Sequence, residues 1–261
     1  LIQNKKALSV TFIITSSFAF LSNLFLLHSV NSEVSYVFGN FSSEIGIEYV
    51  INPFKALILT VFTGITLVFA IFFNGFIRNF EKEFNFNLLF CILQILCGAC
   101  AVIILTNDLI NFYIFFEIIA ICSYILISLG GKGSAYASFN YLMLGIIASG
   151  LLVLGIGFLY FQTGYLNISK VALILQEKNL NLFIPFTFIV VGFLIKLAIF
   201  PFSFWPGLVY KHIPPSILPF YAGVVPIITF YGCFFFVTKL FPGQIASLKP
   251  LIMALCILGI L

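Results

Sequence analysis

Residues 109–129 read LINFYIFFEIIAICSYILISL, an apolar run in which Glu117 is the single charged side chain. A helix of about 20 apolar residues crosses the hydrocarbon core of a bilayer, so this run is long enough to span a membrane. The alternation of polar and apolar residues that is typical of a membrane-spanning β-strand is absent. The run therefore predicts a transmembrane helix that carries one carboxylate.

Similar apolar runs fill the rest of the chain on both sides of this stretch. Of the 261 residues, 62% are hydrophobic and 8% are charged, and the mean hydropathy is +1.20. A soluble domain has roughly 45–50% apolar and ~25% charged residues, so this composition excludes a soluble enzyme. The sequence predicts an all-α, polytopic transmembrane helical bundle that forms a single domain over residues 1–261. The expected spans, about eight in number, are 8–30, 53–74, 88–106, 108–129, 138–161, 183–205, 215–240 and 250–261.

Positively charged residues near the ends of spans indicate which side of the membrane each loop faces. In the first half of the chain, five of them fall on one side of the bundle and Lys55 falls on the other. In the second half of the chain, most lysines fall on the opposite side. Because the charges of the first spans usually set the orientation, the assignment follows the first half. We therefore expect the loops 31–52 and 162–182 to face outward. The five residues that mark the cytoplasmic (or matrix) side are Lys5, Lys6, Arg78, Lys82 and Lys132, in the segments 1–6, 75–87 and 130–136.

The outer segment 31–52 has a composition of its own. Two stretches rich in β-branched and aromatic residues, Val34–Phe38 and Ile45–Ile51, are separated by Gly39, Asn40 and two serines. Short strands bounded by such turn residues are typical of a hairpin. We expect a small β-hairpin outside the membrane.

The charge argues against a nucleic-acid surface, and the cysteines argue against a zinc site and a reactive thiol pair. The net charge of +4 is spread along the chain without a dense run of Lys or Arg, so no nucleic-acid surface is indicated. Cys97 and Cys100 form a CxxC on one helix face, but no second CxxC or His lies at zinc-ligand spacing. Thiols in apolar surroundings are usually inert, so we expect all the cysteines to be packing residues. We expect no bound metal and no cofactor. The other cysteines are Cys91, Cys122, Cys233 and Cys256.

Two charged residues lie near the middle of their spans, where a charge is costly. Glu117 is about ten residues into the span 108–129, and Lys196 is about thirteen into the span 183–205. A charge at the bilayer centre costs at least ~2.5–3.5 kcal/mol, and such residues usually face the bundle interior and mark an ion or proton path. Glu117 and Lys196 are therefore the candidate functional residues.

These two residues support two interpretations. In the first, they form an ion pair that only joins two helices, although buried ion pairs stabilise poorly when compared with apolar replacements. In the second, both are protonatable groups of a relay. Desolvation favours the neutral form of each, and proximity restores both charges, so a change in their separation moves a proton. The second interpretation is preferred.

Pro201, five residues after Lys196, predicts a broken helix. Proline has no backbone N–H, so it frees the carbonyl group of Leu197. A free carbonyl at membrane depth is tolerated where it lines a cavity or a wet path. The alternative interpretation of Pro201 is a simple packing kink.

Further polar residues are assigned lesser roles. Tyr113 and Tyr124 share a helix face with Glu117 at spacings of four and seven, and are either accessory residues of the relay or interface anchors. Asp108, about 13 Å from Glu117 along the helix, is expected to be a helix cap or an access residue. His212 lies at a cytoplasmic span end and either passes protons to the inner surface or, as preferred, is a solvated loop residue.

In the span 138–161, Gly145 and Ser149 belong to a face of small residues. Such faces let membrane helices approach closely, and we assign both residues to packing rather than to chemistry.

At these residues the chain resembles a known family, the D-type subunits of the multisubunit Mrp-type Na⁺/H⁺ antiporters. That family is homologous to the antiporter-like, proton-translocating subunits of respiratory complex I, and the stretch 107–131 favours the Mrp type. The resemblance covers essentially the whole chain. It is carried by 107–118 (NDLINFYIFFEI) with Ser123-Tyr124 and Gly130-Gly131, by 164–168 (GYLNI), and by 192–196 (GFLIK) with Phe200-Pro201 and Phe204-Trp205.

The resemblance implies a fourteen-helix proton-channel fold, in which Glu117 matches the essential glutamate and Lys196 the lysine of a broken helix. It also implies that the family's first helix precedes residue 1 and that about half of its length follows residue 261, so we expect a fragment. One feature departs from the family, which usually carries a Lys or His in the next helix. Residues 224–228 read VVPII here, without a titratable group, so the relay is broken or rerouted beyond Lys196.

Three functional classes follow. The preferred one is a membrane subunit of a Na⁺/H⁺ antiporter complex that translocates protons through Glu117 and Lys196, in the inner (cytoplasmic) membrane of a bacterium. The second is an antiporter-like subunit of NADH:quinone oxidoreductase, in a bacterial or mitochondrial inner membrane, where a partner's electron transfer supplies the energy. The third is a structural remnant of such a complex. In each class the partners are other membrane subunits and the lipid bilayer, and we expect the chain itself to carry out no redox chemistry. The transported ions of the preferred class are H⁺ and Na⁺.

Overall fold

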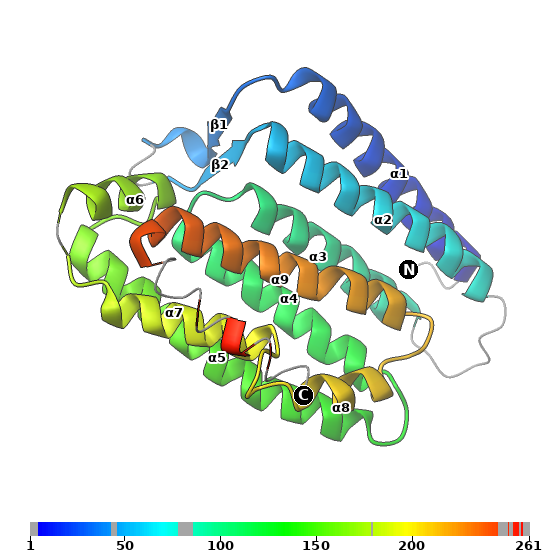
Figure 1. The fold of residues 1–261 in the computed structure, drawn as a ribbon. Coiled ribbons are helices and arrows are strands. Elements are labelled where there is room, and N and C mark those ends of the chain that lie inside the picture. The colour runs from blue at the N-terminus through cyan, green and yellow to red at the C-terminus, as the bar shows by residue number, and fades with distance from the viewer. Residues whose placement is uncertain are drawn as a thin grey trace.

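The computed structural model describes residues 5–42, 46–77, 86–178 and 180–244, together with 250, 253–255 and 257. These residues form a bundle of helices with one short hairpin (Figure 1). The helices are α1 (Lys5–Ser29), α2 (Pro53–Ile77), α3 (Phe86–Leu105), α4 (Leu109–Ser128), α5 (Ser134–Thr163), α6 (Ile168–Glu177), α7 (Phe183–Lys196), α8 (Trp205–His212) and α9 (Leu218–Leu240). The strands are β1 (Val34–Val37) and β2 (Glu48–Ile51), and the short 3₁₀ helices are η1 (Phe38–Asn40) and η2 (Pro242–Gln244).

Among the described residues, six helices are long and apolar enough to cross a membrane: α1, α2, α3, α4, α5 and α9. They correspond to the first five predicted spans and to 215–240, which confirms a polytopic, all-α membrane protein. The predicted span 183–205 instead contains the 14-residue helix α7, which ends at Lys196, and the short helix α8 begins only at Trp205. The predicted span 250–261 lies largely outside the described residues.

The central helices of the bundle are α3, α4 and α9, with α1 and α2 on one side and α5 and α7 on the other (Figure 1). The core lies where these helices meet, and Leu93, Leu96 and Ile104 of α3 and Leu126 of α4 are fully buried. The outermost helix, α1, leaves large apolar side chains such as Phe18 exposed. A helix that is apolar on its outer face is suited to contact lipid.

The two ends of the bundle differ in structure. At one end, β1 pairs with antiparallel β2, with Val34 opposite Ile51 and Val37 opposite Glu48, which confirms the predicted hairpin. The hairpin and α6 lie together at this end, and the loop 130–133 and the α8–α9 connection lie at the other (Figure 1). We call them the hairpin end and the α8 end. The hairpin end is the one that the charge pattern predicts to face outward.

Hydrogen bonds between polar side chains join separate segments of the chain at the hairpin end. The Oε2 atom of Glu48 accepts from Nδ2 of Asn107 at 2.7 Å and from Nδ2 of Asn167 at 2.6 Å. The side chain of Asn167 also caps α6, because it accepts from the backbone N–H of Lys170. The segment 162–182, which the sequence placed as an outer loop, therefore contains a helix.

Small residues let α5 approach the helices on both sides of it. A Cβ atom added to Gly192 of α7 would lie 2.8 Å from the carbonyl oxygen of Ala148. A Cβ atom added to Gly145 would lie 1.8 Å from the hydroxyl oxygen of Tyr124 on α4. Gly145 belongs to the predicted small-residue face, and Gly192 of α7 packs against the same face at Ala148, so both glycines permit the close spacing of the helices. Gly150 is different, because nothing lies within 4 Å of its Cβ position.

Candidate functional site

The helix that carries Glu117, α4, begins at a well-defined cap. The carboxylate of Asp108 accepts from the backbone N–H of Asn111 at 2.7 Å, which satisfies a donor at the start of the helix. Nδ2 of Asn111 donates in turn to Oγ1 of Thr106 at 2.8 Å. Asp108 is thus a helix cap, one of the two roles considered for it, and this cap fixes where along the bundle Glu117 lies.

The helix that carries Lys196, α7, ends at that residue in a strained turn. Ala198 has a φ of 54°, in the left-handed region, where a residue with a Cβ atom is strained by ~1–3 kcal/mol. The carbonyl oxygen of Ile195 accepts from the backbone N–H of Ala198 at 3.2 Å and from Nε1–H of Trp205 at 3.0 Å. Trp205, the first residue of α8, therefore stabilises the end of α7.

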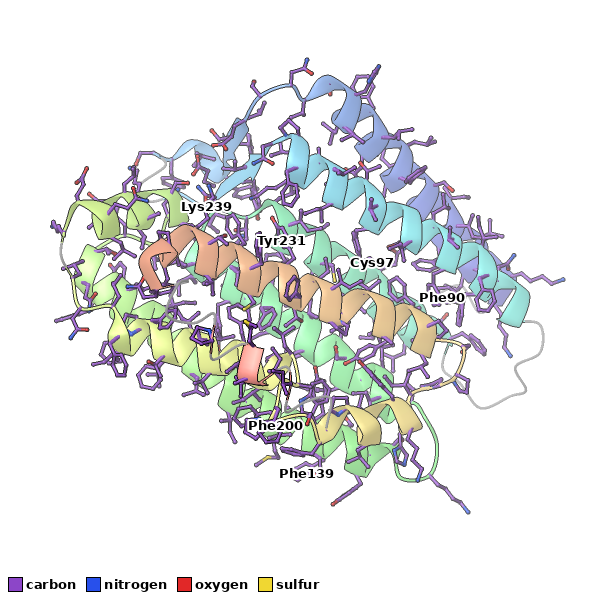
Figure 2. The ribbon with its side chains drawn as sticks, viewed as in Figure 1. Phe90, Cys97, Phe139, Phe200, Tyr231 and Lys239 are labelled. Carbon is purple, nitrogen blue, oxygen red and sulfur yellow. The ribbon has the colours of Figure 1, made fainter. Side chains whose placement is uncertain are left out.

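Pro201 lies beyond this turn and not at it. The sequence placed the helix break at Pro201, but the regular helix ends five residues earlier because the chain turns at Ala198. The peptide bond between Phe200 and Pro201 is cis, and Phe200 lies in the irregular segment that leads from α7 to α8 (Figure 2). In the part of the chain that the structure describes, no hydrogen bond reaches the carbonyl oxygen of Leu197.

Glu117 and Lys196 face each other between α4 and α7. The Nζ atom of Lys196 lies 3.6 Å from Oε1 of Glu117, and their side chains are 5% and 29% exposed, respectively. Nζ also lies 5.0 Å from the ring centroid of Phe116, within the range of a cation–π contact. A carboxylate and an aromatic face thus enclose the ammonium group, while Glu117 keeps partial access to its surroundings.

Ser149 of α5 is the third member of the site. Its hydroxyl donates to Oε1 of Glu117 and also lies 2.8 Å from the carbonyl oxygen of Gly145. A serine has one hydroxyl proton, so it donates to one of these acceptors at a time. The assignment of Ser149 to packing alone was incomplete. Its four-residue spacing from Gly145 fits a packing face, and no local pattern shows that the same hydroxyl reaches a charge on another helix.

The other residues considered from the sequence lie at different distances from the ion pair. Tyr124 lies toward the α8 end, with its ring centroid 5.1 Å from that of Tyr141 in an edge-on arrangement. Tyr113 is half-buried, one turn from Glu117 toward the hairpin end. His212 is the last residue of α8 and not a loop residue, and its Nδ1 atom lies 2.8 Å from the carbonyl oxygen four residues earlier. It lies at the α8 end, away from the ion pair.

The cysteines of the described segments lie within helices and are unpaired. Cys100 and Cys122 are buried, and Cys97 is half-buried on α3 (Figure 2). Cys256 lies outside the described residues. In the described ranges, no group of three or more His, Cys, Asp or Glu side chains is placed to hold a metal ion.

Residues 106–261 match the family model described as NADH:quinone oxidoreductase/Mrp antiporter, TM. The chain is 35% identical over 204 residues to the N-type subunit of the NADH-quinone oxidoreductase of Desulforudis audaxviator, and the match covers 74% of this chain and 40% of the relative. It is 33% identical over 187 residues to the D-type subunit of the Na(+)/H(+) antiporter of Bacillus subtilis, and this match covers 68% of this chain and 36% of the relative. The chain thus spans less than half the length of these relatives.

The fold is similar to that of a chain in the Mrp complex from Dietzia sp. DQ12-45-1b. The TM-score is 0.81 at 22% identity, and the match covers 92% of this chain and 45% of that chain. At this identity the likeness shows the fold alone, and it is the antiporter-like fold that the resemblance implied.

Proposed function

We propose that this chain, which belongs to the NADH:quinone oxidoreductase/Mrp antiporter transmembrane family, is a membrane subunit of a Na⁺/H⁺ antiporter complex. In this proposal, protons move through Glu117 and Lys196. The observation that carries the proposal is the 3.6 Å contact between Nζ of Lys196 and Oε1 of Glu117, at the point where α7 ends. The identity to a relative named as the D-type subunit of an antiporter supports it. The proposed location is the inner (cytoplasmic) membrane of a bacterium, with other membrane subunits as partners.

Protons can move through this pair because an unpaired charge on either Glu117 or Lys196 is energetically unfavourable inside the membrane. An unpaired charge at the bilayer centre costs at least ~2.5–3.5 kcal/mol, whereas the two charges offset each other when they are in contact. When a proton reaches Glu117, the carboxyl group becomes neutral and Lys196 loses its counter-charge. Loss of the counter-charge favours release of a proton from the ammonium group. Arrival of a proton at one residue is therefore coupled to its departure from the other.

The end of α7 gives Lys196 a second place to bind. An ammonium group has three donors, and its 3.6 Å ion pair with Glu117 does not occupy all of them. The carbonyl oxygen of Leu197, which accepts no hydrogen bond from the described residues, is an acceptor adjacent in the chain. A lysine that leaves a protonated Glu117 is stabilised by this carbonyl group or by a water bound to it.

A second candidate function is an antiporter-like subunit of an NADH:quinone oxidoreductase, favoured by the 35% identity to an N-type subunit of such a complex. In that case Glu117 and Lys196 would carry protons in the same way, but electron transfer in a partner would supply the energy. The membrane would then be a bacterial or mitochondrial inner membrane.

Ion flux in vesicles that contain the assembled complex tests the proposal. Proton flux that depends on Na⁺ and needs no NADH is expected for the antiporter, and flux that requires NADH oxidation would identify the second function. Glu117→Gln is expected to abolish flux in both cases. Asp108→Asn is the matched control, because it removes the carboxylate of the helix cap but leaves a residue that still caps a helix. Wild-type flux through an assembled Glu117→Gln complex overturns the relay.

A further inference from the structure

Tyr221, near the start of α9, has a fully buried hydroxyl group. The side chain is 1% exposed, and within the described residues its hydroxyl oxygen forms no hydrogen bond. It lies close to the hydroxyl groups of Ser123 on α4, which is fully buried, and of Tyr141 on α5. A buried hydroxyl that lacks a hydrogen bond destabilises a fold, and such groups are rare in folded proteins. Ser123 and Tyr141 are thus the nearby groups that can exchange a hydrogen bond with this hydroxyl, directly or through a water.

Side chains that carry hydroxyl groups lie between Tyr221 and the ion pair. The ring of Tyr141 contacts the ring of Tyr124 at a centroid distance of 5.1 Å. The hydroxyl oxygen of Tyr124 lies against Gly145, only 1.8 Å from where a Cβ atom of that residue would be. The carbonyl group of Gly145 is one of the two acceptors of the Ser149 hydroxyl, and the other is Glu117. Hydroxyl-bearing side chains thus follow one another from the carboxylate toward the start of α9, with ring contacts between the tyrosines.

The same groups extend toward the α8 end of the bundle. The ring of Tyr210, on α8, lies 6.4 Å from the ring of Tyr221, and Trp205 stacks on Tyr141 at 4.5 Å. α8 then ends at His212, next to the loop 130–133. By contrast, residues 224–228 of α9 offer no titratable side chain.

We propose that the hydroxyl groups of Ser149, Tyr124, Tyr141 and Tyr221 form a proton-conducting branch between Glu117 and the α8 end of the bundle. This inference rests on the proposed function of Glu117. A hydroxyl group passes a proton by accepting one on its oxygen and releasing its own on the other side, with bridging waters between neighbours. No residue is oxidised or reduced, and each hydroxyl is restored after the transfer.

Tyr-to-Phe substitutions separate this role from packing, because they keep the aromatic ring and remove only the hydroxyl. Tyr221→Phe, Tyr141→Phe and Tyr124→Phe are introduced singly into the assembled complex, and proton flux is measured in vesicles in H₂O and in D₂O. Each is expected to lower flux roughly 10-fold or more, as for other lost proton-transfer groups. The solvent isotope effect should rise, since proton transfer becomes rate-limiting, and a purely structural change would not raise it.

Tyr231→Phe is the matched control on the same helix. Tyr231 is buried on α9, but its hydroxyl donates to the carbonyl oxygen of Ile104 at 3.1 Å and so has a structural partner (Figure 2). This variant is expected to keep wild-type flux and isotope effect.

A second pair of variants tests the branch without removing a hydroxyl. Gly145→Ala displaces the hydroxyl of Tyr124, whereas Gly150→Ala on the same helix meets nothing within 4 Å. We expect Gly145→Ala to lower proton flux and Gly150→Ala to leave it unchanged. If a Tyr-to-Phe variant does not assemble, this pair of glycine variants still shows whether the branch conducts protons.

Glu117→Gln, measured in parallel, distinguishes failure of the branch from failure of the proposed function. If Glu117→Gln is inactive while the three Phe variants and Gly145→Ala keep wild-type flux, the branch is overturned and the relay stands. If Glu117→Gln is active, the relay itself fails and the branch fails with it.

Discussion

Oε1 of Glu117 lies 3.6 Å from Nζ of Lys196, and the same oxygen accepts the hydroxyl of Ser149. One carboxylate oxygen therefore joins α4, α5 and α7. A proton that binds this carboxylate weakens both contacts at once, so the three side chains respond to protonation as a unit.

Ser149→Ala removes the hydroxyl group that donates to the carboxylate of Glu117. A hydrogen bond to a charged group contributes ~1.5–3 kcal/mol, so we expect proton exchange to slow roughly tenfold. The measurement is the exchange rate in vesicles, normalised to the amount of assembled complex. Ser128→Ala is the control, because its exposed hydroxyl donates only to the carbonyl of Ile125 on the same helix. Equal rates for the two variants would remove Ser149 from the site.

Substitutions of Glu117 should rank by whether a carboxylate remains. Glu117→Asp keeps a group that binds and releases a proton, although it is one methylene shorter, so partial exchange is expected. Glu117→Gln and Glu117→Ala should show none, because neither side chain exchanges a proton under these conditions. The exchange rates of the three variants, compared at equal complex content, check this order. A Gln variant as active as the Asp variant would contradict it.

Gly192→Ala is expected to destabilise the bundle, because the added Cβ would lie 2.8 Å from the carbonyl oxygen of Ala148 and α7 must move away from α5. Overpacking of this kind typically costs ~1–3 kcal/mol. The thermal unfolding midpoint of the purified complex should fall, and Gly150→Ala should leave it nearly unchanged. A Gly192→Ala protein as stable as the wild type would mean that α5 and α7 do not pack this closely.

The membrane-spanning helices could be predicted from sequence because their signal is local. A run of about 20 apolar residues is sufficient to identify a span, and helices α2, α3, α4 and α9 lie close to the predicted ranges. The expected depths of Glu117 and Lys196 come from counting residues within the predicted spans, and they stay predictions; α7 ends at Lys196 and does not continue through the rest of its predicted span. The hairpin could be predicted for the same reason, because its strands and turn are adjacent in the chain.

The end of α7 and the role of Ser149 could not be predicted, because both depend on contacts between separate segments. Pro201 is the strongest local helix breaker, so the sequence placed the break there. The helix ends earlier, where Trp205 donates to the carbonyl of Ile195 and stacks on Tyr141 of α5. Ser149 likewise acquires its role from a carboxylate on α4, and no pattern within α5 indicates it.

The predicted topology can be tested with single cysteines in a background that lacks the native ones. Ser35→Cys lies on the exposed hairpin and Lys132→Cys on the exposed loop at the opposite end of the bundle. We expect a membrane-impermeant thiol reagent to label position 35 from outside and position 132 from inside. Labelling of position 35 from the cytoplasmic side alone would reverse the assignment based on Lys and Arg.

Lys196→Arg tests whether the site needs a positive charge or an exchangeable proton. Arginine remains protonated in proteins, so it keeps the ion pair with Glu117 but does not release its proton. We expect the Lys196→Arg complex to assemble and to show no proton exchange. Exchange at the wild-type rate would show that the charge alone is sufficient.

The most direct test of the relay is proton flux through the assembled double variant Glu117→Gln with Lys196→Met. This change removes both charges together, so it leaves no unpaired charge at membrane depth, and a pair that served only to join helices should tolerate it. The relay predicts that the double variant assembles to the wild-type level and transports no protons. Wild-type flux through the double variant would contradict the proposal that Glu117 and Lys196 carry the proton.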